Sequence, residues 1–216
     1  MLHCFHGFLG SRYDFDSFQK TEIHDLYHLC EKSKDDLINL LDAEIPPGSM
    51  LLGYSFGGRL AMQLFLKNPD KYKKCFVISA HCGLKDKAAK MQRVLFDQKC
   101  ADKLRELSEE EFLKGWNSQD LFKYDQPIEK FPIQDKNVMA RFFTEYGLST
   151  QDYLVDDLLE YKDKLHFFYG EKDSKYYDYA KNLQCMGFSV DIIKDGGHRL
   201  LQTNSEKIRD LMRTYV

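Results

Sequence analysis

The sequence predicts an α/β fold with a doubly wound, mostly parallel sheet and an inserted helical lid. Short apolar runs with strand character alternate with helix-patterned segments, which is the arrangement of parallel sheets. A glycine-rich turn at 53–57 joins one such strand to a helix, and between 84 and 146 no strand-like run occurs. We therefore expect a core built from residues 1–83 and 147–216 and a lid at 84–146.

The first part of the chain predicts four strands separated by helical segments. Ser33 is the expected N-cap of one helix, and Pro46-Pro47-Gly48 breaks the chain before the next strand. The expected strands are at 2–6, 21–27, 50–52 and 75–79. The expected helical segments are a turn within 12–20 and helices at 33–43 and 59–66.

The rest of the chain predicts the lid and the end of the sheet. Two or three short helices are expected in the lid, because apolar positions recur there at helical spacing. Their marked positions are Asp97, Ala101, Leu104, Leu107, Phe112, Leu113, Trp116 and Phe122. Strands at 165–169 and 189–193 and helices at 176–186 and 205–215 should complete the core.

Charge and hydropathy exclude several classes of function. The chain of 216 residues has a formal net charge of −3 and a pI near 6.2, without a basic stripe, so no nucleic-acid partner is expected. No apolar run approaches the roughly 20 residues of a membrane span. The N-terminus lacks the features of a signal peptide, which predicts a cytoplasmic protein.

The cysteines and histidines do not predict a metal site or a disulfide framework. The six cysteines include no C-x-x-C pair and are interpreted as reduced thiols. His3 and His6, or His24 and His28, have spacings that metal ligands can have, but neither pair has a third ligand nearby in the sequence. Neither a metal nor another cofactor is therefore expected.

Residues 53–57, Gly-Tyr-Ser-Phe-Gly, match the G-x-S-x-G turn that presents a nucleophilic serine. The glycines allow a strained turn in which neighbouring Cβ atoms would collide. Ser55 is thereby expected to be exposed at the start of a helix. A glycine-rich turn whose serine has no chemical role is the alternative, so the surrounding residues must decide.

Two further residues would complete a catalytic triad with Ser55. Asp173 and His198 each follow a predicted strand, and the order Ser, Asp, His is that of the α/β-hydrolases. Both lie where parallel sheets place their sites, beyond the carboxyl ends of strands. Glu171 and Asp195 are alternative acids, and Asp173 is preferred for its place in the loop.

An oxyanion hole requires two backbone N–H donors near the serine. Phe56, directly after Ser55, would provide one. Phe8, in the loop after the first strand, would provide the other. His6 is expected to support this loop by hydrogen bonding and not to act as a catalyst.

Taken together, these segments resemble the 2-succinyl-6-hydroxy-2,4-cyclohexadiene-1-carboxylate synthases of menaquinone (vitamin K2) biosynthesis, a branch of the α/β-hydrolase superfamily. The matching segments extend from the first residues to His198. They are His6–Ser11, Gly53–Arg59, Ser79–Leu84, Arg93 with Asp97 and Ala101, Phe112–Phe122 and Gly170–Lys175. The elbow and the His-Gly loop occur in many hydrolases, whereas Arg59, the Trp116 segment and Gly170–Lys175 are more specific.

The resemblance implies a lyase in which Ser55, activated by His198 and Asp173, removes a ring proton and pyruvate is eliminated. It also implies a small polycarboxylate substrate, because arginine binds carboxylates bidentately. The implied substrate-binding residues are Tyr54, Arg59, Arg93, Trp116, His81 and, as a weaker candidate, Arg141. Surface exposure for the arginines and core packing for Tyr54 and Trp116 remain the alternatives.

The chain departs from this family at its start, where members normally have two more strands before the His-Gly loop. We expect an N-terminally shortened sheet of about six strands. A carboxylesterase or thioester hydrolase with Ser55 as nucleophile is the alternative function. A non-catalytic binding protein is a third possibility, against which the complete set of Ser55, Asp173 and His198 argues.

Overall fold

The structure is a computed structural model that describes residues 1–215. Its centre is a sheet of six parallel strands in the order β2-β1-β3-β4-β5-β6. The strands are β1 Leu2–Phe5, β2 Thr21–His24, β3 Met50–Tyr54, β4 Lys74–Ile78, β5 Leu165–Gly170 and β6 Ser189–Ile193. The predicted parallel sheet of about six strands is confirmed.

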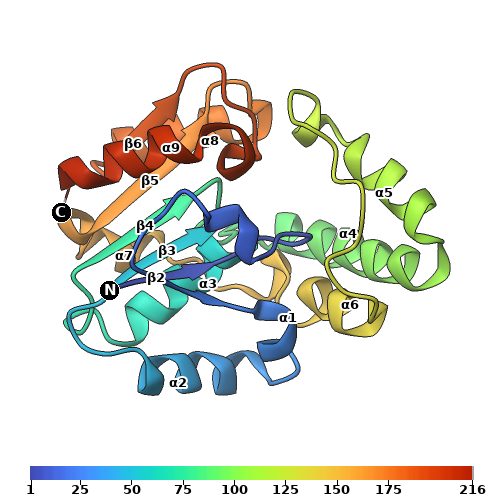
Figure 1. Cartoon of the computed structure of the whole chain (residues 1–216), viewed down its shortest axis with the longest axis horizontal. Helices are drawn as coiled ribbons and strands as arrows, with labels where there is room; N and C mark the ends of the chain where they lie inside the picture. The colour runs from blue at the N-terminus through green and yellow to red at the C-terminus, as the bar shows by residue number, and fades with distance from the viewer. Residues whose placement is uncertain (216) are drawn as a thin grey trace.

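Helices connect the strands and surround the sheet (Figure 1). The α-helices are α1 Leu26–Leu29, α2 Lys34–Glu44, α3 Phe56–Lys67, α4 Lys87–Glu106, α5 Glu109–Asn117, α6 Lys136–Thr144, α7 Val155–Leu159, α8 Ser174–Cys185 and α9 Leu200–Met212. The 3₁₀ turns are η1 Arg12–Phe15, η2 Asp120–Phe122, η3 Leu148–Thr150, η4 Lys162–Lys164 and η5 Arg213–Tyr215. As expected, the hydroxyl of Ser33 caps α2 by accepting from the N–H of Asp36.

Alternation along the strands divides the core into two layers. On β3, Leu51 packs into the layer with α2, α3 and α8, whereas Leu52 packs into the layer with η1 and α9. On β4, Val77 and Phe76 divide in the same way. Because successive strand residues point to opposite faces, both faces are apolar and both are covered. This is the doubly wound arrangement.

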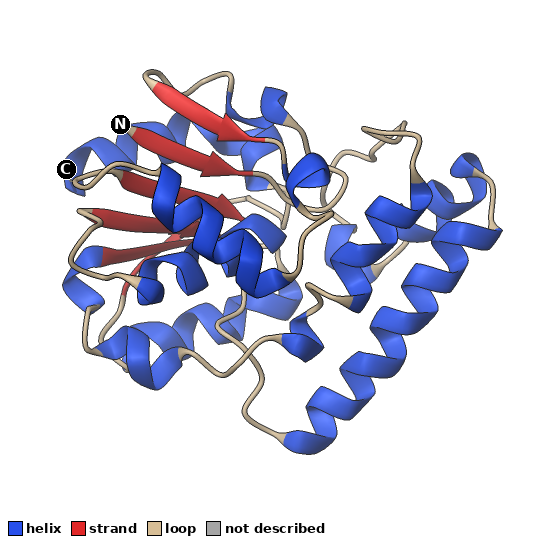
Figure 2. Cartoon of the chain, turned by 90° about the horizontal axis from the view of Figure 1, so that it is seen from below, coloured by secondary structure: helices blue, strands red, loops and turns tan. Residues whose placement is uncertain are grey.

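The helices α4 and α5 of the segment between β4 and β5 lie beyond the carboxyl ends of the strands. In Figure 2 the strand arrows point towards the side of the molecule that holds its long helix, α4. One expectation for this segment was wrong, because α4 is not short but has 20 residues. It contains no glycine or proline, is rich in good helix formers, and begins at the capping side chain of Asp86.

The last helix begins earlier than the pattern predicts. We expected it at 205–215, but α9 starts at Leu200. Asn204 inside it has non-helical dihedrals, with φ −135° and ψ 19°, and marks a kink. The polar run around Asn204 therefore resembles a helix boundary in the sequence, although Leu200 and Leu201 are buried helical residues.

Within residues 1–215 no helix has the length and apolar character that crossing a bilayer requires. All six cysteines are free thiols, and four of them are buried.

Candidate active site

Ser55 lies in a strained turn between β3 and α3. Its dihedrals are φ 51° and ψ −108°, a conformation that L-residues rarely adopt. The flanking glycines permit this turn, because a Cβ at Gly53 would collide with the backbone of Gly57, and one at Gly57 with the backbone of Phe5. The turn holds the Ser55 side chain at the carboxyl edge of the sheet.

The structure brings His198 and Asp173 to this serine. Ser55 Oγ lies 3.2 Å from His198 Nε2, and His198 Nδ1 lies 2.7 Å from Asp173 Oδ2. Asp173 is fully buried at the N-terminus of α8, where its other carboxylate oxygen accepts from the Tyr176 N–H. A carboxylate can only accept, so Nδ1 carries the proton and Nε2 is free to accept from the serine hydroxyl.

The alternative acids lie elsewhere. Glu171 is exposed and accepts a hydrogen bond from the backbone N–H of Asp195. The Asp195 carboxylate pairs with Lys172 at 2.8 Å. Neither carboxylate contacts His198 among the described residues, so the geometry favours Asp173.

Phe8 and Phe56 both line the cavity that contains Ser55. Phe56 is the first residue of α3, so its N–H has no intrahelical partner and the helix dipole favours negative charge there. Buried His6 supports the Phe8 loop, because Nδ1 donates to the Gly7 carbonyl and Nε2 accepts from the Leu26 N–H. His6 thus has the supporting position expected from the sequence.

The cavity at Ser55 lies between the sheet and the 84–146 segment and has a volume of about 90 Å³. Three cationic side chains line it, from Arg59, Arg93 and Lys175. Its aromatic wall contains Phe8, Trp116, Phe122, Phe142, Phe143 and Tyr176. A larger hollow of about 480 Å³ opens beside α2 and contains none of these residues. Since the Ser55 cavity has one histidine and no carboxylate or thiol among its described lining residues, it offers no metal-ligand set.

The cations at the cavity are only partly neutralised. Arg93 Nε donates to buried Asp97 at 2.7 Å, and Asp97 also accepts from Ser149. Within residues 1–215 neither Arg59 nor Lys175 forms an ion pair with a carboxylate; Arg59 instead donates to the Tyr146 carbonyl. Burial, and then the neighbouring charge of Arg93, lower the pKa of Arg59 to about 10. The same two causes lower the pKa of Lys175. The site therefore holds unpaired positive charge that an anionic ligand could neutralise.

Two further expected residues lie at the site. Trp116 packs edge-on against Phe8, with ring centroids 4.9 Å apart, and contacts Phe143 and Phe122. Tyr54 is buried directly before Ser55 and lines a smaller adjoining hollow, with its ring 5.9 Å from that of His198.

The structure does not bring His81 or Arg141 to the cavity lining. The His81 ring stacks on Tyr179 at 4.2 Å, although burial and the charges of Lys175, Arg59 and Arg93 lower its pKa to about 4. Arg141 donates to the carbonyls of Cys30 and Lys32 and pairs with Glu145, so it connects α6 to the end of α1. Helical periodicity points its neighbours Phe142 and Phe143, rather than Arg141, into the cavity.

Sequence reasoning missed a group of residues that supports His198 from the 84–146 segment. The Asp125 carboxylate accepts from the backbone N–H groups of His198 and Arg199, each at 3.0 Å. Buried Arg199 donates to the Gln126 carbonyl at 2.6 Å and to Asn117 Oδ1 at 2.9 Å. Its guanidinium lies 4.0 Å from the centroid of the Phe122 ring. In the sequence, the only indication of this supporting group is that Arg199 directly follows His198.

Lys175 was also missed as a site residue, although it lies two residues after Asp173 in a segment that carries the family resemblance. A cation so close in sequence to the proposed triad acid could have indicated that Lys175 belongs to the site.

The comparisons with known proteins agree with this architecture. No protein-family model matches the chain. It is 25% identical over 185 residues to a 2-succinyl-6-hydroxy-2,4-cyclohexadiene-1-carboxylate synthase of Salmonella paratyphi B, covering 81% of this chain and 72% of the relative. It is 26% identical over 160 residues to the synthase of that name from an Enterobacter species, covering 71% of this chain. The chain spans 61% of that second relative, less than two thirds of its length.

Solved structures show the same fold. The structure of MenH from S. aureus superposes with a TM-score of 0.85 at 23% identity, covering 99% of this chain and 92% of that one. Several carboxylesterases also match, with TM-scores of 0.60 to 0.65 and identities of 12 to 17%.

Proposed function

Starting from a chain that has the α/β-hydrolase fold and resembles the MenH synthases, we propose that it is a carbon–oxygen lyase of menaquinone biosynthesis. Its substrate would be 2-succinyl-5-enolpyruvyl-6-hydroxy-3-cyclohexene-1-carboxylate, and its products 2-succinyl-6-hydroxy-2,4-cyclohexadiene-1-carboxylate and pyruvate. The proposal assigns the reaction to the cytoplasm.

The observation that carries the proposal is the cationic lining of the Ser55 cavity. Arg59, Arg93 and Lys175 converge on the cavity that contains Ser55 and His198. An apolar ester does not require such charge, whereas a substrate with several carboxylates does, and guanidinium groups bind carboxylates bidentately. Trp116 and Tyr54 would contact the substrate.

The triad geometry is suited to proton abstraction. The Ser55 hydroxyl would pass its proton to His198 Nε2 while Oγ removes a proton from the cyclohexene ring. The electron pair of that C–H bond, at ring carbon 2, would form the C2–C3 double bond, the existing C3–C4 double bond would shift to C4–C5, and the bond between C5 and the enolpyruvyl oxygen would break. The released enolpyruvate takes up a proton and becomes pyruvate. The N–H groups of Phe8 and Phe56 would stabilise the negative charge that develops.

The segment 84–146 would act as a lid. The cavity of about 90 Å³ is smaller than the several hundred Å³ of a typical small-molecule site. In this proposal the lid helices move away to admit substrate and close to exclude water.

The test is pyruvate release by the purified protein with the cyclohexene substrate, measured with a coupled dehydrogenase. We expect release by the wild type and none by Ser55→Ala, which should keep its fold because the hydroxyl makes no packing contact on which the core depends. Wild-type protein that releases no pyruvate from this substrate would refute the lyase assignment.

The second candidate is a carboxylesterase or thioester hydrolase with Ser55 as nucleophile. The same serine–histidine–aspartate geometry supports it, and so does the fold shared with solved carboxylesterases. Hydrolysis of p-nitrophenyl acetate, measured beside pyruvate release, separates the two. Ester cleavage that depends on Ser55, without pyruvate release, would favour the hydrolase.

A further inference from the structure

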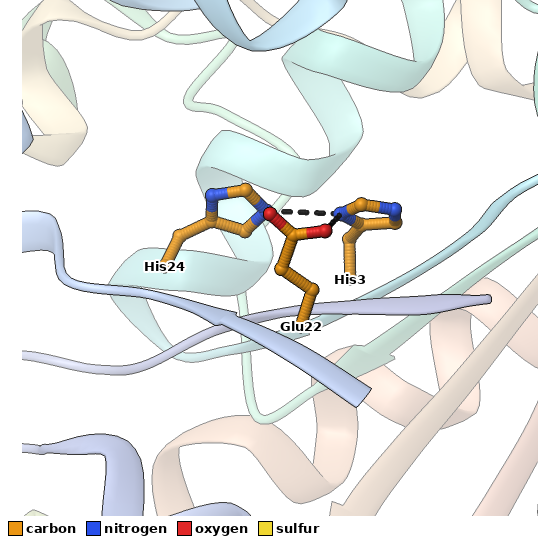
Figure 3. A group of neighbouring side chains, drawn as sticks. All are labelled: His3, Glu22 and His24. Carbon is orange, nitrogen blue, oxygen red and sulfur yellow. Dashed lines mark hydrogen bonds and ion pairs between the residues drawn. The ribbon is translucent and has the colours of Figure 1, made fainter. Parts of the chain in front are cut away.

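Three side chains that commonly bind metals meet on the β1–β2 edge of the sheet, outside the Ser55 cavity. The parallel register places His3 of β1 beside Glu22 of β2, and alternation along β2 puts His24 on the same face as Glu22. One potential ligand atom from each residue lies within 4.8 Å of the other two. Figure 3 shows the two imidazoles and the carboxylate directed towards one another.

The separations are close to those of a metal-bound set. His3 Nδ1 lies 3.1 Å from His24 Nε2 and 3.6 Å from the Glu22 carboxylate. Two ligand atoms of a tetrahedral zinc ion, each about 2.0–2.1 Å from the metal, are about 3.3–3.4 Å apart. The remaining separation, between the ligand atoms of His24 and Glu22, is within 4.8 Å, so rotation of the exposed Glu22 side chain would complete the set around one ion.

The two rings are held in place by packing. The His24 ring stacks between Phe5 and His3, with centroids at 4.8 Å and 5.3 Å. The exposed fractions of His3 and His24 are only 1% and 9%. One nitrogen of the hydrogen-bonded pair His3 Nδ1 and His24 Nε2 carries the shared proton, which a bound metal would displace.

Glu22 provides both charge and access. Its side chain is 56% exposed, so the cluster can be reached from solvent on that side. The other nearby histidine, His6, is not part of this cluster, because both its ring nitrogens are hydrogen-bonded to backbone groups.

We propose that His3, Glu22 and His24 form a binding site for one divalent zinc-class cation, with water as the fourth ligand. Two imidazoles and a carboxylate are a common ligand set for zinc, and the nitrogen ligands disfavour magnesium and calcium. Within the part of the chain that the structure describes, β2 is an end strand that pairs only with β1. A metal shared by these strands would fasten the sheet edge, a structural role separate from chemistry at Ser55.

The experiment is calorimetric titration of metal-free full-length protein with zinc. We expect one zinc per chain, and weaker binding by Glu22→Gln and His24→Gln. Loss of an outer partner of a metal ligand already costs about 10- to 100-fold in affinity, so loss of a ligand should cost at least as much. Glu22→Gln changes an exposed side chain and should fold normally even if His24→Gln does not, which circular dichroism would show.

Matched controls exclude other zinc ligands. His28→Gln and Cys185→Ser remove an exposed histidine and an exposed thiol outside the cluster, and both should bind zinc as the wild type does. Cobalt in place of zinc should give a four-coordinate absorption spectrum without a thiolate charge-transfer band. Ser55→Ala should also bind zinc normally, so this test is independent of the proposed lyase activity. Equal affinity in the wild type, Glu22→Gln and His24→Gln would overturn the proposal, as would loss of binding in either control.

Discussion

At the scale of single residues, the structure distinguishes among carboxylates that the sequence left as alternatives. Glu171, Asp173 and Asp195 lie within one pair of neighbouring loops. Only Asp173 is buried against His198, whereas the other two are exposed and engaged elsewhere. All three side chains are carboxylates, so only their positions in the structure distinguish the triad acid from the other two.

Asp173→Asn should lower kcat for the proposed reaction by about 10⁴-fold, because an amide can stabilise the wrong His198 tautomer. Steady-state kinetics would measure this, with Glu171→Gln and Asp195→Asn as controls that should retain activity near the wild-type level. Comparable losses in a control and in Asp173→Asn would contradict the assignment of the acid.

Two glycines offer a matched test of the strained turn. A Cβ at Gly57 would collide with the backbone of β1, whereas one at Gly115 of α5 would meet no atom within 4 Å. Gly57→Ala should lower the free energy of unfolding by at least about 2–3 kcal/mol. Gly115→Ala should be neutral or stabilise by up to about 1 kcal/mol. Urea denaturation would measure both, and equal stability of the two variants would be inconsistent with this packing.

At the scale of elements, the 84–146 segment is connected to the loop that carries His198. Asp125 accepts from two backbone N–H groups of that loop, and Arg199 returns two hydrogen bonds to the segment. These contacts join elements about 70 residues apart in the sequence. They would allow the position of the proposed lid to influence the position of His198.

Asp125→Ala should lower kcat more than it raises KM, because Asp125 would position His198 without touching substrate. Hydrogen bonds to a charged group contribute about 1.5–3 kcal/mol, so a loss of about tenfold or more in kcat is expected. Asp125→Asn keeps one acceptor oxygen and should retain part of the kcat that Asp125→Ala loses. Exposed Asp120 lies in the same segment, and Asp120→Asn should have no effect. A folded Asp125→Ala enzyme with wild-type kcat would remove Asp125 from this role.

At the scale of the whole molecule, buried and half-buried histidines make stability depend on pH. Burial lowers the pKa of five of them, and for His24 and His81 the pKa falls to about 4. The five are His3, His6, His24, His81 and His166. Because the unfolded chain titrates them near pH 6.5, it binds more protons than the folded chain below that pH. Their contribution to stability is therefore complete above about pH 6.5 and is lost as the pH falls.

The free energy of unfolding should decrease by more than about 2 kcal/mol between about pH 7 and pH 5, with a limiting slope of about 1.4 kcal/mol per pH unit for each histidine. Asp14 opposes this below pH 6, because burial raises its pKa to about 6. Urea titrations at several pH values would measure the slope. His81→Gln should reduce it, and His28→Gln, at an exposed position, should not. A free energy independent of pH over this range would refute the prediction.

The sequence by itself determined the alternation of strands and helices in a parallel sheet and the glycine turn at Ser55, whereas the lid at 84–146 and the triad stay predictions. The alternation and the turn follow from local causes, namely apolar periodicity, capping residues and a glycine turn that only one backbone geometry satisfies. The kinked start of α9 and the length of α4 were missed, because polar residues inside a helix resemble boundaries and only packing resolves them.

Contacts between distant segments were decided by the tertiary structure alone. Arg141 points to the end of α1 rather than to the cavity, Asp125 reaches the backbone of His198, and Glu22 lies beside His3 across the strand pair. Spacing along the sequence could not show which residues join His3 in the proposed metal site, because Glu22 and His24 come from a different strand. The register of the strands and the rotation of the helices determine these contacts. Both depend on the packing of the whole core, and a local sequence pattern does not contain that information.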